Sequence, residues 1–107
     1  MSIRQEQLSD PAVRALVEAV NANDREAFLA VLTADATMSD DGSDRDLHQW
    51  IDKEIFSAGG RMDIQDESDG GRALTVLFTN DTWGTMRTRW KFVVDGRRIT
   101  RFETGQA

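Results

Sequence analysis

His48 is the residue of this chain best suited to moving a proton, because it is the only histidine among the 107 residues. Imidazole is the side-chain group that ordinarily gains and loses a proton near neutral pH. Asp52 follows four residues later, so on a helix its carboxylate can orient the imidazole as a general base. His48 is therefore a candidate catalytic residue, against the commoner interpretation of a surface histidine beside an incidental carboxylate. Two ligands are too few for a metal site, and we expect neither metal nor cofactor.

Asp40 and Asp41 form a second candidate acid–base group. Two adjacent carboxylates can differ in proton affinity, so that one acts as the acid and the other as the base. Gly42 follows directly, and an Asp-Asp-Gly sequence is also typical of a turn. We favour the turn and keep Asp40 as a candidate catalytic base.

Large apolar side chains are spaced so that a curved sheet would bring them over the third predicted helix. They would then line a concavity suited to a hydrophobic or aromatic ligand, with a few polar groups to orient it. The predicted ligand-binding residues are Met38, Trp50, Phe78, Met86, Thr88, Trp90 and Arg101. The alternative is that these side chains fill the core and leave no cavity, because a short chain has little core to spare.

Several of these residues belong to one predicted strand, residues 83–95, which has the strictest alternation in the chain. From Met86 onward the even positions are mainly apolar, whereas the odd positions are Arg87, Arg89, Lys91 and Val93. This pattern is typical of a strand in an antiparallel sheet with one buried face. We expect the even face to line the concavity and the odd face to meet solvent or a second subunit.

The length of the loop before this strand determines whether its apolar face lies on the same side of the sheet as that of the preceding strand. A slip of one residue would place the two faces on opposite sides. A loop of residues 81–83, closed by Gly84 in or near a bulge, aligns the faces, whereas a two-residue loop does not. The predicted pairs are Phe78 with Met86, Val76 with Thr88, and Leu74 with Trp90.

Asp95-Gly96 predicts a second hairpin, leading into a last strand over residues 97–104. A two-residue loop there would place Arg101 beside Trp90. A bulged three-residue loop would place Phe102 there instead. The sequence leaves both registers open.

Three helices are predicted before these strands. Asp10 caps the first, and Val13, Leu16, Val17 and Val20 form its apolar stripe. A second, carrying Phe28, Val31 and Leu32, is expected to start with Asn23 and Glu26 at capping-box spacing. A third is expected from Ser43, again at capping-box spacing from Asp46, to Gly59. A short extended segment over residues 35–39 separates the second helix from the third, and strands over residues 61–67 and 72–80 follow.

Composition indicates one soluble globular domain over residues 1–107, with residues 1–9 expected to be flexible. The net charge of −6 argues against nucleic-acid and anionic-membrane partners. Residues 1–81 carry 7 basic and 17 acidic side chains, whereas residues 82–107 carry 6 and 2. No cysteine, targeting segment or membrane-length apolar run is present, and we expect a cytoplasmic protein.

The order of elements and two segments of the chain resemble a known superfamily. Residues 13–38, with Ala27-Phe28 and Leu32-Thr33-Ala34-Asp35, and residues 92–102 resemble the nuclear-transport-factor-two-like superfamily, in particular its SnoaL-like branch. The resemblance implies an α+β cone, in which a curved antiparallel or mixed sheet wraps around three N-terminal helices. It also implies a pocket at one end and a homodimer through the outer sheet face. The chain has no tyrosine, so the oxyanion tyrosine of the ketosteroid isomerases in that superfamily is absent.

Three functional hypotheses follow. The first is a SnoaL-like protein that binds a small apolar or aromatic molecule in the cone pocket. The second is a non-catalytic homodimeric or partner-binding module. The third is a small cyclase, isomerase or hydrolase using His48 or Asp40 as its base, as the enzymes of that superfamily imply.

Overall fold

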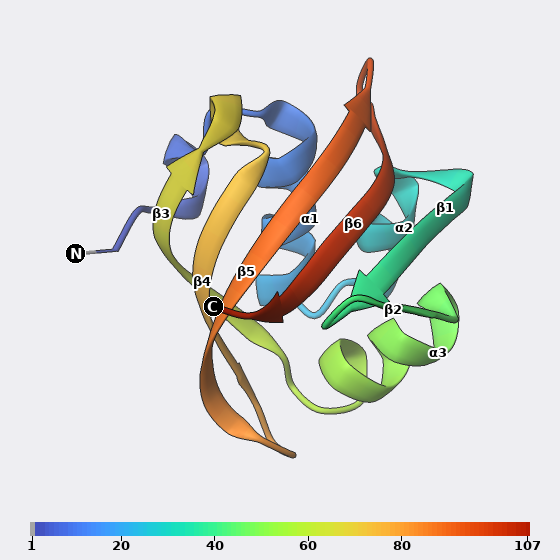
Figure 1. Cartoon of the computed structure of the whole chain (residues 1–107), viewed down its shortest axis with the longest axis vertical. Coiled ribbons are helices and arrows are strands. Elements are labelled where there is room, and N and C mark those ends of the chain that lie inside the picture. The colour runs from blue at the N-terminus through green and yellow to red at the C-terminus, as the bar shows by residue number, and fades with distance from the viewer. Residues whose placement is uncertain (1) are drawn as a thin grey trace.

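A curved sheet wraps around a layer of helices in the computed structural model, which describes residues 2–107 (Figure 1). The six strands lie in the order β2-β1-β6-β5-β4-β3, and only β1 and β6 run parallel. The strands are β1 (Leu32–Asp40), β2 (Ser43–Arg45), β3 (Arg61–Ser68), β4 (Ala73–Asn80), β5 (Gly84–Asp95) and β6 (Arg98–Gln106). The helices are α1 (Pro11–Asn21), α2 (Arg25–Ala30) and α3 (Leu47–Ile51), with the π-helical turn η2 (Asp52–Phe56) continuing α3 and the 3-10 turns η1 (Gln5–Gln7) and η3 (Asp69–Gly71). The predicted α+β cone is confirmed.

Helix α1 forms as its sequence predicts. The Asp10 carboxylate accepts hydrogen bonds from the backbone N–H groups of Ala12 (2.9 Å) and Val13 (3.1 Å), which have no partner within the helix. Pro11 occupies the first helical position, where a missing N–H costs nothing. The predicted apolar stripe is fully buried against the concave face of the sheet.

The second helix starts one residue later than predicted. Asp24, not Asn23, is its cap, and its carboxylate accepts a hydrogen bond from the Ala27 N–H at 3.0 Å. Asn23 has a φ of 53° and links the two helices in the left-handed conformation that asparagine tolerates. The helix ends at Ala30, so Leu32 belongs to β1 and not to the helix as predicted, and β1 is longer than the extended segment expected over residues 35–39.

The start of the third helix is also corrected. Ser43 was expected to cap it, but Ser43–Arg45 forms β2, which pairs with the end of β1. Asp41 and Gly42 connect these strands with φ values of 49° and 83°, the left-handed pair that a tight two-residue hairpin requires. The helix begins at Leu47, and Asp46 caps it by accepting a hydrogen bond from the Gln49 N–H at 3.0 Å.

The hairpin between β4 and β5 has the predicted register. Asn80 pairs with Gly84, so the loop contains residues 81–83, and all three predicted pairs are present. Gly84 has a φ of 74°, which explains a glycine at the end of this loop. Pairing then continues along β5 without a register shift, so no bulge interrupts it.

The last hairpin follows neither predicted register. Gly96 and Arg97 form its loop, and a bulge at Thr100 shifts the pairing between β5 and β6, so Trp90 lies opposite Thr104 and not Arg101 or Phe102. The physical reason is that Ile99 and Phe102 are both fully buried although they are three residues apart. Strict alternation cannot place both on one face, and one extra residue restores the pattern.

Trp90 is the centre of the core on the concave face. Its indole is stacked near Phe92 (centroids 6.3 Å apart, 16° between planes) and Phe102 (5.7 Å, 23°). It is 1% exposed, so much of the predicted lining does fill the cone. Burial of aromatic side chains at this scale dominates the stability of a small domain.

Residues 2–9, part of the segment predicted to be flexible, contact the rest of the domain. Ile3 pairs with Ile64 of β3 by a single backbone bridge, and Leu8 is buried in the core at 2% exposure. Met1 lies outside the described residues. No helix in the described part of the chain is both long and apolar enough to cross a bilayer.

Candidate functional site

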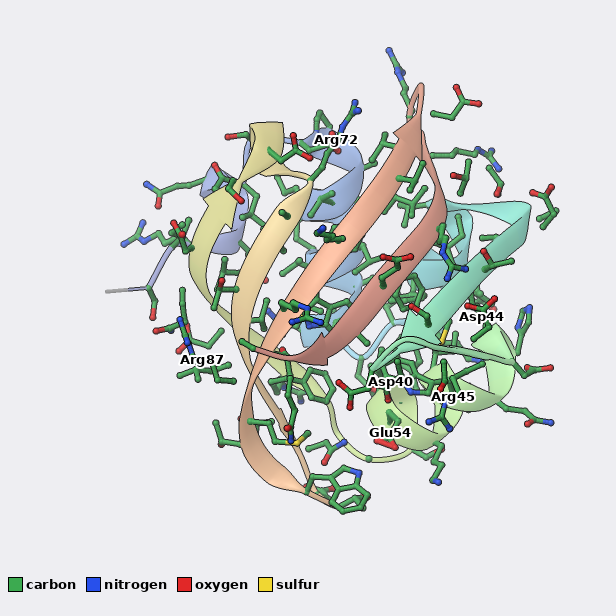
Figure 2. All side chains as sticks on the ribbon, in the orientation of Figure 1. Asp40, Asp44, Arg45, Glu54, Arg72 and Arg87 are labelled. Atoms are coloured by element: carbon green, nitrogen blue, oxygen red, sulfur yellow. The ribbon has the colours of Figure 1, made fainter. Side chains whose placement is uncertain are left out.

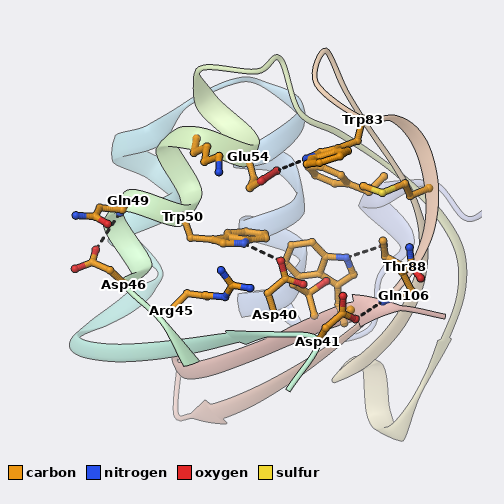
Figure 3. A pocket seen from close by; sticks show the side chains of 16 residues that line it. Asp40, Asp41, Arg45, Asp46, Gln49, Trp50, Glu54, Trp83, Thr88 and Gln106 are labelled. Atoms are coloured by element: carbon orange, nitrogen blue, oxygen red, sulfur yellow. Dashed lines mark hydrogen bonds between the residues drawn. The ribbon is translucent and has the colours of Figure 1, made fainter. Parts of the chain in front are cut away.

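A pocket of about 530 Å³ opens at the end of the cone where α3 and η2 face the hairpin between β4 and β5 (Figure 3). Its aromatic and apolar lining is Trp50, Phe78, Trp83, Met86 and Trp90. Its charged lining is Asp40, Asp41, Asp46 and Glu54, with Arg45 and Lys53, and the remaining lining is Gln49, Thr88, Thr104, Gly105 and Gln106. Figure 2 shows Asp40, Arg45 and Glu54 beside α3, whereas Arg72 and Arg87 lie elsewhere on the molecule.

The sheet register places the strand residues of this pocket. Asp40 on β1 lies opposite Thr104 on β6, which lies opposite Trp90 on β5. Residues paired across strands point to the same face, so these three side chains form one row on the concave side. Thr88 belongs to the next row, opposite Gln106 and Val76.

Hydrogen bonds fix two of the three indoles that line the pocket. The Trp50 Nε1–H donates to Asp40 Oδ2 at 3.1 Å. The Trp90 Nε1–H donates to Thr88 Oγ1 at 3.0 Å, and that hydroxyl donates to the Val76 carbonyl at 3.0 Å. The two rings meet edge to face, with centroids 6.1 Å apart and planes at 69°. The pocket therefore has two rigid aromatic walls at a steep angle.

Asp41 serves the turn, as the sequence indicates. Its N–H donates to the Thr104 carbonyl at 2.9 Å, and its Oδ1 accepts a hydrogen bond from the Gln106 N–H at 3.0 Å. A Cβ atom on Gly105 would lie only 2.6 Å from that oxygen. Because Gly105 has no side chain, Asp41 can join the β1–β2 turn to the end of β6. These contacts give Asp41 a structural role in the turn.

Trp83 closes the far side of the pocket from the loop between β4 and β5. Its indole N–H donates to Glu54 Oε2 at 3.2 Å, and its backbone N–H donates to Asn80 Oδ1 at 2.8 Å. Asn80 is buried and donates to the Glu54 carbonyl at 2.9 Å. The loop is thereby tied to η2, while the Trp83 side chain stays 60% exposed.

His48 does not line the pocket. It is exposed on α3, and Asp52 is bound to Arg25 instead, with its Oδ1 2.6 Å from Arg25 Nε. This hydrogen bond raises the pKa of Arg25 above its ordinary value. Arg25 Nη2 also lies 3.5 Å from His48 Nδ1, so the expected orientation of His48 by Asp52 is replaced by a contact with a cation.

Arg101 and Met38 also lie outside the pocket lining. Arg101 donates hydrogen bonds to Asp44, Glu103 and Thr37 at distances of 2.7–3.0 Å, which tie β1, β2 and β6 together. The hydrogen bonds to Asp44 and Glu103 raise the pKa of Arg101. The Thr100 bulge is what turns Arg101 away from the concave face. Met38 is fully buried in the core. The other predicted ligand-binding residues, Trp50, Phe78, Met86, Thr88 and Trp90, and the candidate base Asp40, line the pocket together.

The sequence reasoning missed the polar half of the lining. Gln49, Trp50, Lys53 and Glu54 follow the spacing of one helical face, and this signal would have found them once Trp50 was assigned to the pocket. Trp83 had been assigned to a loop, where nothing in the sequence shows which way a side chain points. Within residues 2–107, no three His, Asp or Glu side chains converge to hold a metal ion.

Solved structures with the same fold include three informative cases. A candidate polyketide cyclase from Sinorhizobium meliloti is 17% identical over 95% of this chain and 99% of its own, with a TM-score of 0.77. An NTF2-like protein of unknown function from Cytophaga hutchinsonii is 11% identical over 97% and 90%, with a TM-score of 0.69. A Mycobacterium tuberculosis protein in complex with estradiol-17β-hemisuccinate is 18% identical over 87% and 88%, with a TM-score of 0.71.

No protein-family model matches the chain, and no curated protein matches it in sequence. Identities this low show a shared fold and nothing finer. The nuclear-transport-factor-two-like fold that the sequence resemblance implies is confirmed by these neighbours.

Proposed function

We propose that this chain, which has the nuclear-transport-factor-two-like fold, is a SnoaL-like protein that binds a small apolar or aromatic molecule in the pocket beside α3 and η2. The observation that carries the proposal is an open pocket of about 530 Å³ with Trp50, Trp83 and Phe78 among its walls. Small-molecule sites commonly have volumes of about 300–1,000 Å³ and mainly apolar walls with a few polar groups.

Rigid walls favour such binding, because a ligand loses affinity when it must first order the protein. Trp50 is held by Asp40, and Trp90 is held by Thr88. Asp40 Oδ1 accepts no hydrogen bond from any described residue, so it can accept one from a ligand. The Mycobacterium tuberculosis protein was solved in complex with estradiol-17β-hemisuccinate, and an apolar ring system such as that of estradiol would suit the aromatic walls proposed here.

Titration of tryptophan fluorescence with flat aromatic compounds tests the proposal. We expect saturable quenching. Gln106→Trp should lower the affinity for the compound about tenfold or more, because the added indole would fill the pocket. Gln65→Trp on β3 lies outside the lining and is the matched control. Quenching that is linear with concentration, or equal in the two variants, would contradict the proposal.

A second candidate function is catalysis of the cyclase, isomerase or hydrolase type with Asp40 as the base. It is favoured by the position of Asp40, whose carboxylate borders the pocket with one oxygen free among the described residues. His48 is exposed and lies outside the lining, so its position does not favour it as the base. Conversion of a bound compound by the wild-type protein but not by Asp40→Asn would distinguish catalysis from binding alone.

A third candidate is a homodimeric module that uses the outer sheet face. The residues Arg87, Arg89 and Lys91 on β5 are exposed there, and Val93 beside them is 55% exposed. A second copy packed on this face would remove Val93 from water. This use of the outer face is compatible with a ligand in the cone.

A further inference from the structure

Two indoles at the mouth of the pocket remain open to a ligand. Trp50 is half-buried and Trp83 is 60% exposed, whereas Trp90 beneath them is almost fully buried. Glu54, one helical turn after Trp50, lies near both rings in the close-up view and accepts the Trp83 indole hydrogen (Figure 3). Aromatic faces carry negative charge density, so such a mouth attracts cations in addition to apolar groups.

Two carboxylates lie beside these rings, and each accepts a hydrogen bond from one of the two indole N–H groups. Glu54 Oε2 and Asp40 Oδ2 accept the hydrogen bonds from Trp83 and Trp50, and the other oxygen of each carboxylate accepts none from the described residues. Neither carboxylate forms an ion pair with any described cation. Both charges are therefore uncompensated by a direct partner at the edge of the pocket.

Basic side chains at the rim do not reverse this balance. Arg45 and Lys53 are exposed and border the same pocket, which also holds four carboxylates. An anionic ligand would have to approach these carboxylates, whereas a cationic one would meet opposite charge and two indole faces together. Attraction between opposite charges and repulsion between like charges both grow as distance and the local dielectric constant fall.

From this geometry we infer that the ligand joins a cationic nitrogen to its apolar or aromatic part, and that the nitrogen sits at the mouth of the pocket beside Trp83 and Glu54. The inference rests on the proposed function and names the ligand class of the same site. An organic ammonium group is the chemistry that both indole faces and a carboxylate recognise. The apolar part would lie deeper, over Phe78 and Met86.

Three naphthyl probes of different charge test the inference by isothermal titration calorimetry. They are a naphthylmethyl trimethylammonium salt, the neutral neopentylnaphthalene that matches it in shape, and naphthylacetate. We expect the cation to bind about tenfold more tightly than the neutral compound, as a partly desolvated cation–π contact with a nearby carboxylate would give. The anion should bind more weakly than the neutral compound.

Three variants test which residues produce the preference for the cation. Glu54→Gln keeps an acceptor for the Trp83 indole while it removes the charge, so the preference for the cation should fall to about threefold with little change for the neutral compound. Trp83→Leu should lower affinity for the cation more than for the neutral compound. Asp63→Asn, an exposed carboxylate on β3 outside the pocket, should change neither.

Equal binding of the cation and the neutral compound would refute the inference and leave the proposed function standing. Tighter binding of naphthylacetate would refute it as well and would assign the rim to Arg45 and Lys53. Failure of all three probes to bind would contradict the proposed function, and the inference with it.

Discussion

Thr88 joins the pocket to the sheet through a single hydroxyl. That hydroxyl accepts the Trp90 indole hydrogen and donates to the Val76 carbonyl, both at 3.0 Å, in a residue that is 7% exposed. A buried polar group left without a partner costs far more than an ordinary hydrogen bond contributes. The sequence placed Thr88 on the concave face by alternation, but it did not indicate that its neighbour two residues on would be its partner.

Thr88→Val should therefore destabilise the protein although valine has nearly the same shape. The Trp90 indole N–H would lose its partner, whereas the Val76 carbonyl keeps its backbone hydrogen bond within the β4–β5 ladder. The free energy of unfolding should therefore fall by about 1–3 kcal/mol. Thr88→Ser keeps the hydroxyl, and the lost methyl group should cost only about 1 kcal/mol. Urea unfolding followed by tryptophan fluorescence measures both. A Thr88→Val protein as stable as the Thr88→Ser protein would show that the hydroxyl is not needed.

Among the elements, β5 is predictable from the sequence, because its alternation runs through most of the strand and every odd residue from Arg87 to Lys91 is cationic. The loop before it was predictable because only one loop length aligns two apolar faces. Strand β6 was not, since its pattern breaks at Thr100 and a bulge can be inserted at any such break.

The site divides in the same way. Its apolar half followed from the strands, where the face of a residue depends only on parity. The lining residues that the sequence did not indicate include Gln49, Lys53 and Glu54 on α3 and η2, and Trp83 in the loop before β5. The predicted helix began too early, at Ser43, because β2 is too short to show alternation. Met38 lies too deep in the core to line the pocket, and the Thr100 bulge turns Arg101 away from the concave face. Both outcomes depend on contacts between strands that are distant in the sequence.

The bulge itself makes a prediction about β6. Deleting Thr100 leaves Ile99, Arg101 and Phe102 in strict alternation, so both apolar residues still face the core without a bulge. We expect a cooperatively folded protein that loses at most about 2 kcal/mol of stability. Deleting the exposed Lys91 from β5 is the control, because it moves Trp90 and Phe92 to opposite faces and should abolish folding. Near-ultraviolet circular dichroism and thermal unfolding measure the outcome, and equal damage from the two deletions would contradict this account of the bulge.

At the scale of the whole molecule, charge is divided between two regions. The outer face of β5 exposes Arg87, Arg89 and Lys91, whereas the pocket at the end of the cone has more carboxylates than basic groups. Cross-strand neighbours neutralise only the end of the cationic row. Glu103 on β6 pairs with Lys91, whereas the neighbours of Arg87 and Arg89 on β4, Leu77 and Thr75, carry no charge. The net charge of −6 therefore conceals a positive stripe on the outer face of β5.

This stripe determines how a homodimer through the sheet should respond to salt. A two-fold axis near β5 would bring Arg87, Arg89 and Lys91 of two copies together, and like charges facing each other oppose association. Salt screens that repulsion, with a screening length of about 10 Å at 0.1 M and about 3 Å at 1 M. We therefore expect the dimer dissociation constant, measured by analytical ultracentrifugation, to fall as the salt concentration rises. Arg89→Glu should strengthen the dimer at low salt. The same variant should remove most of the salt dependence. Val93→Asp should weaken the dimer at every salt concentration, because it places charge in the buried apolar part of the interface. A protein that stays monomeric throughout this range would contradict the homodimer, and a dimer weakened by salt would place its interface away from β5.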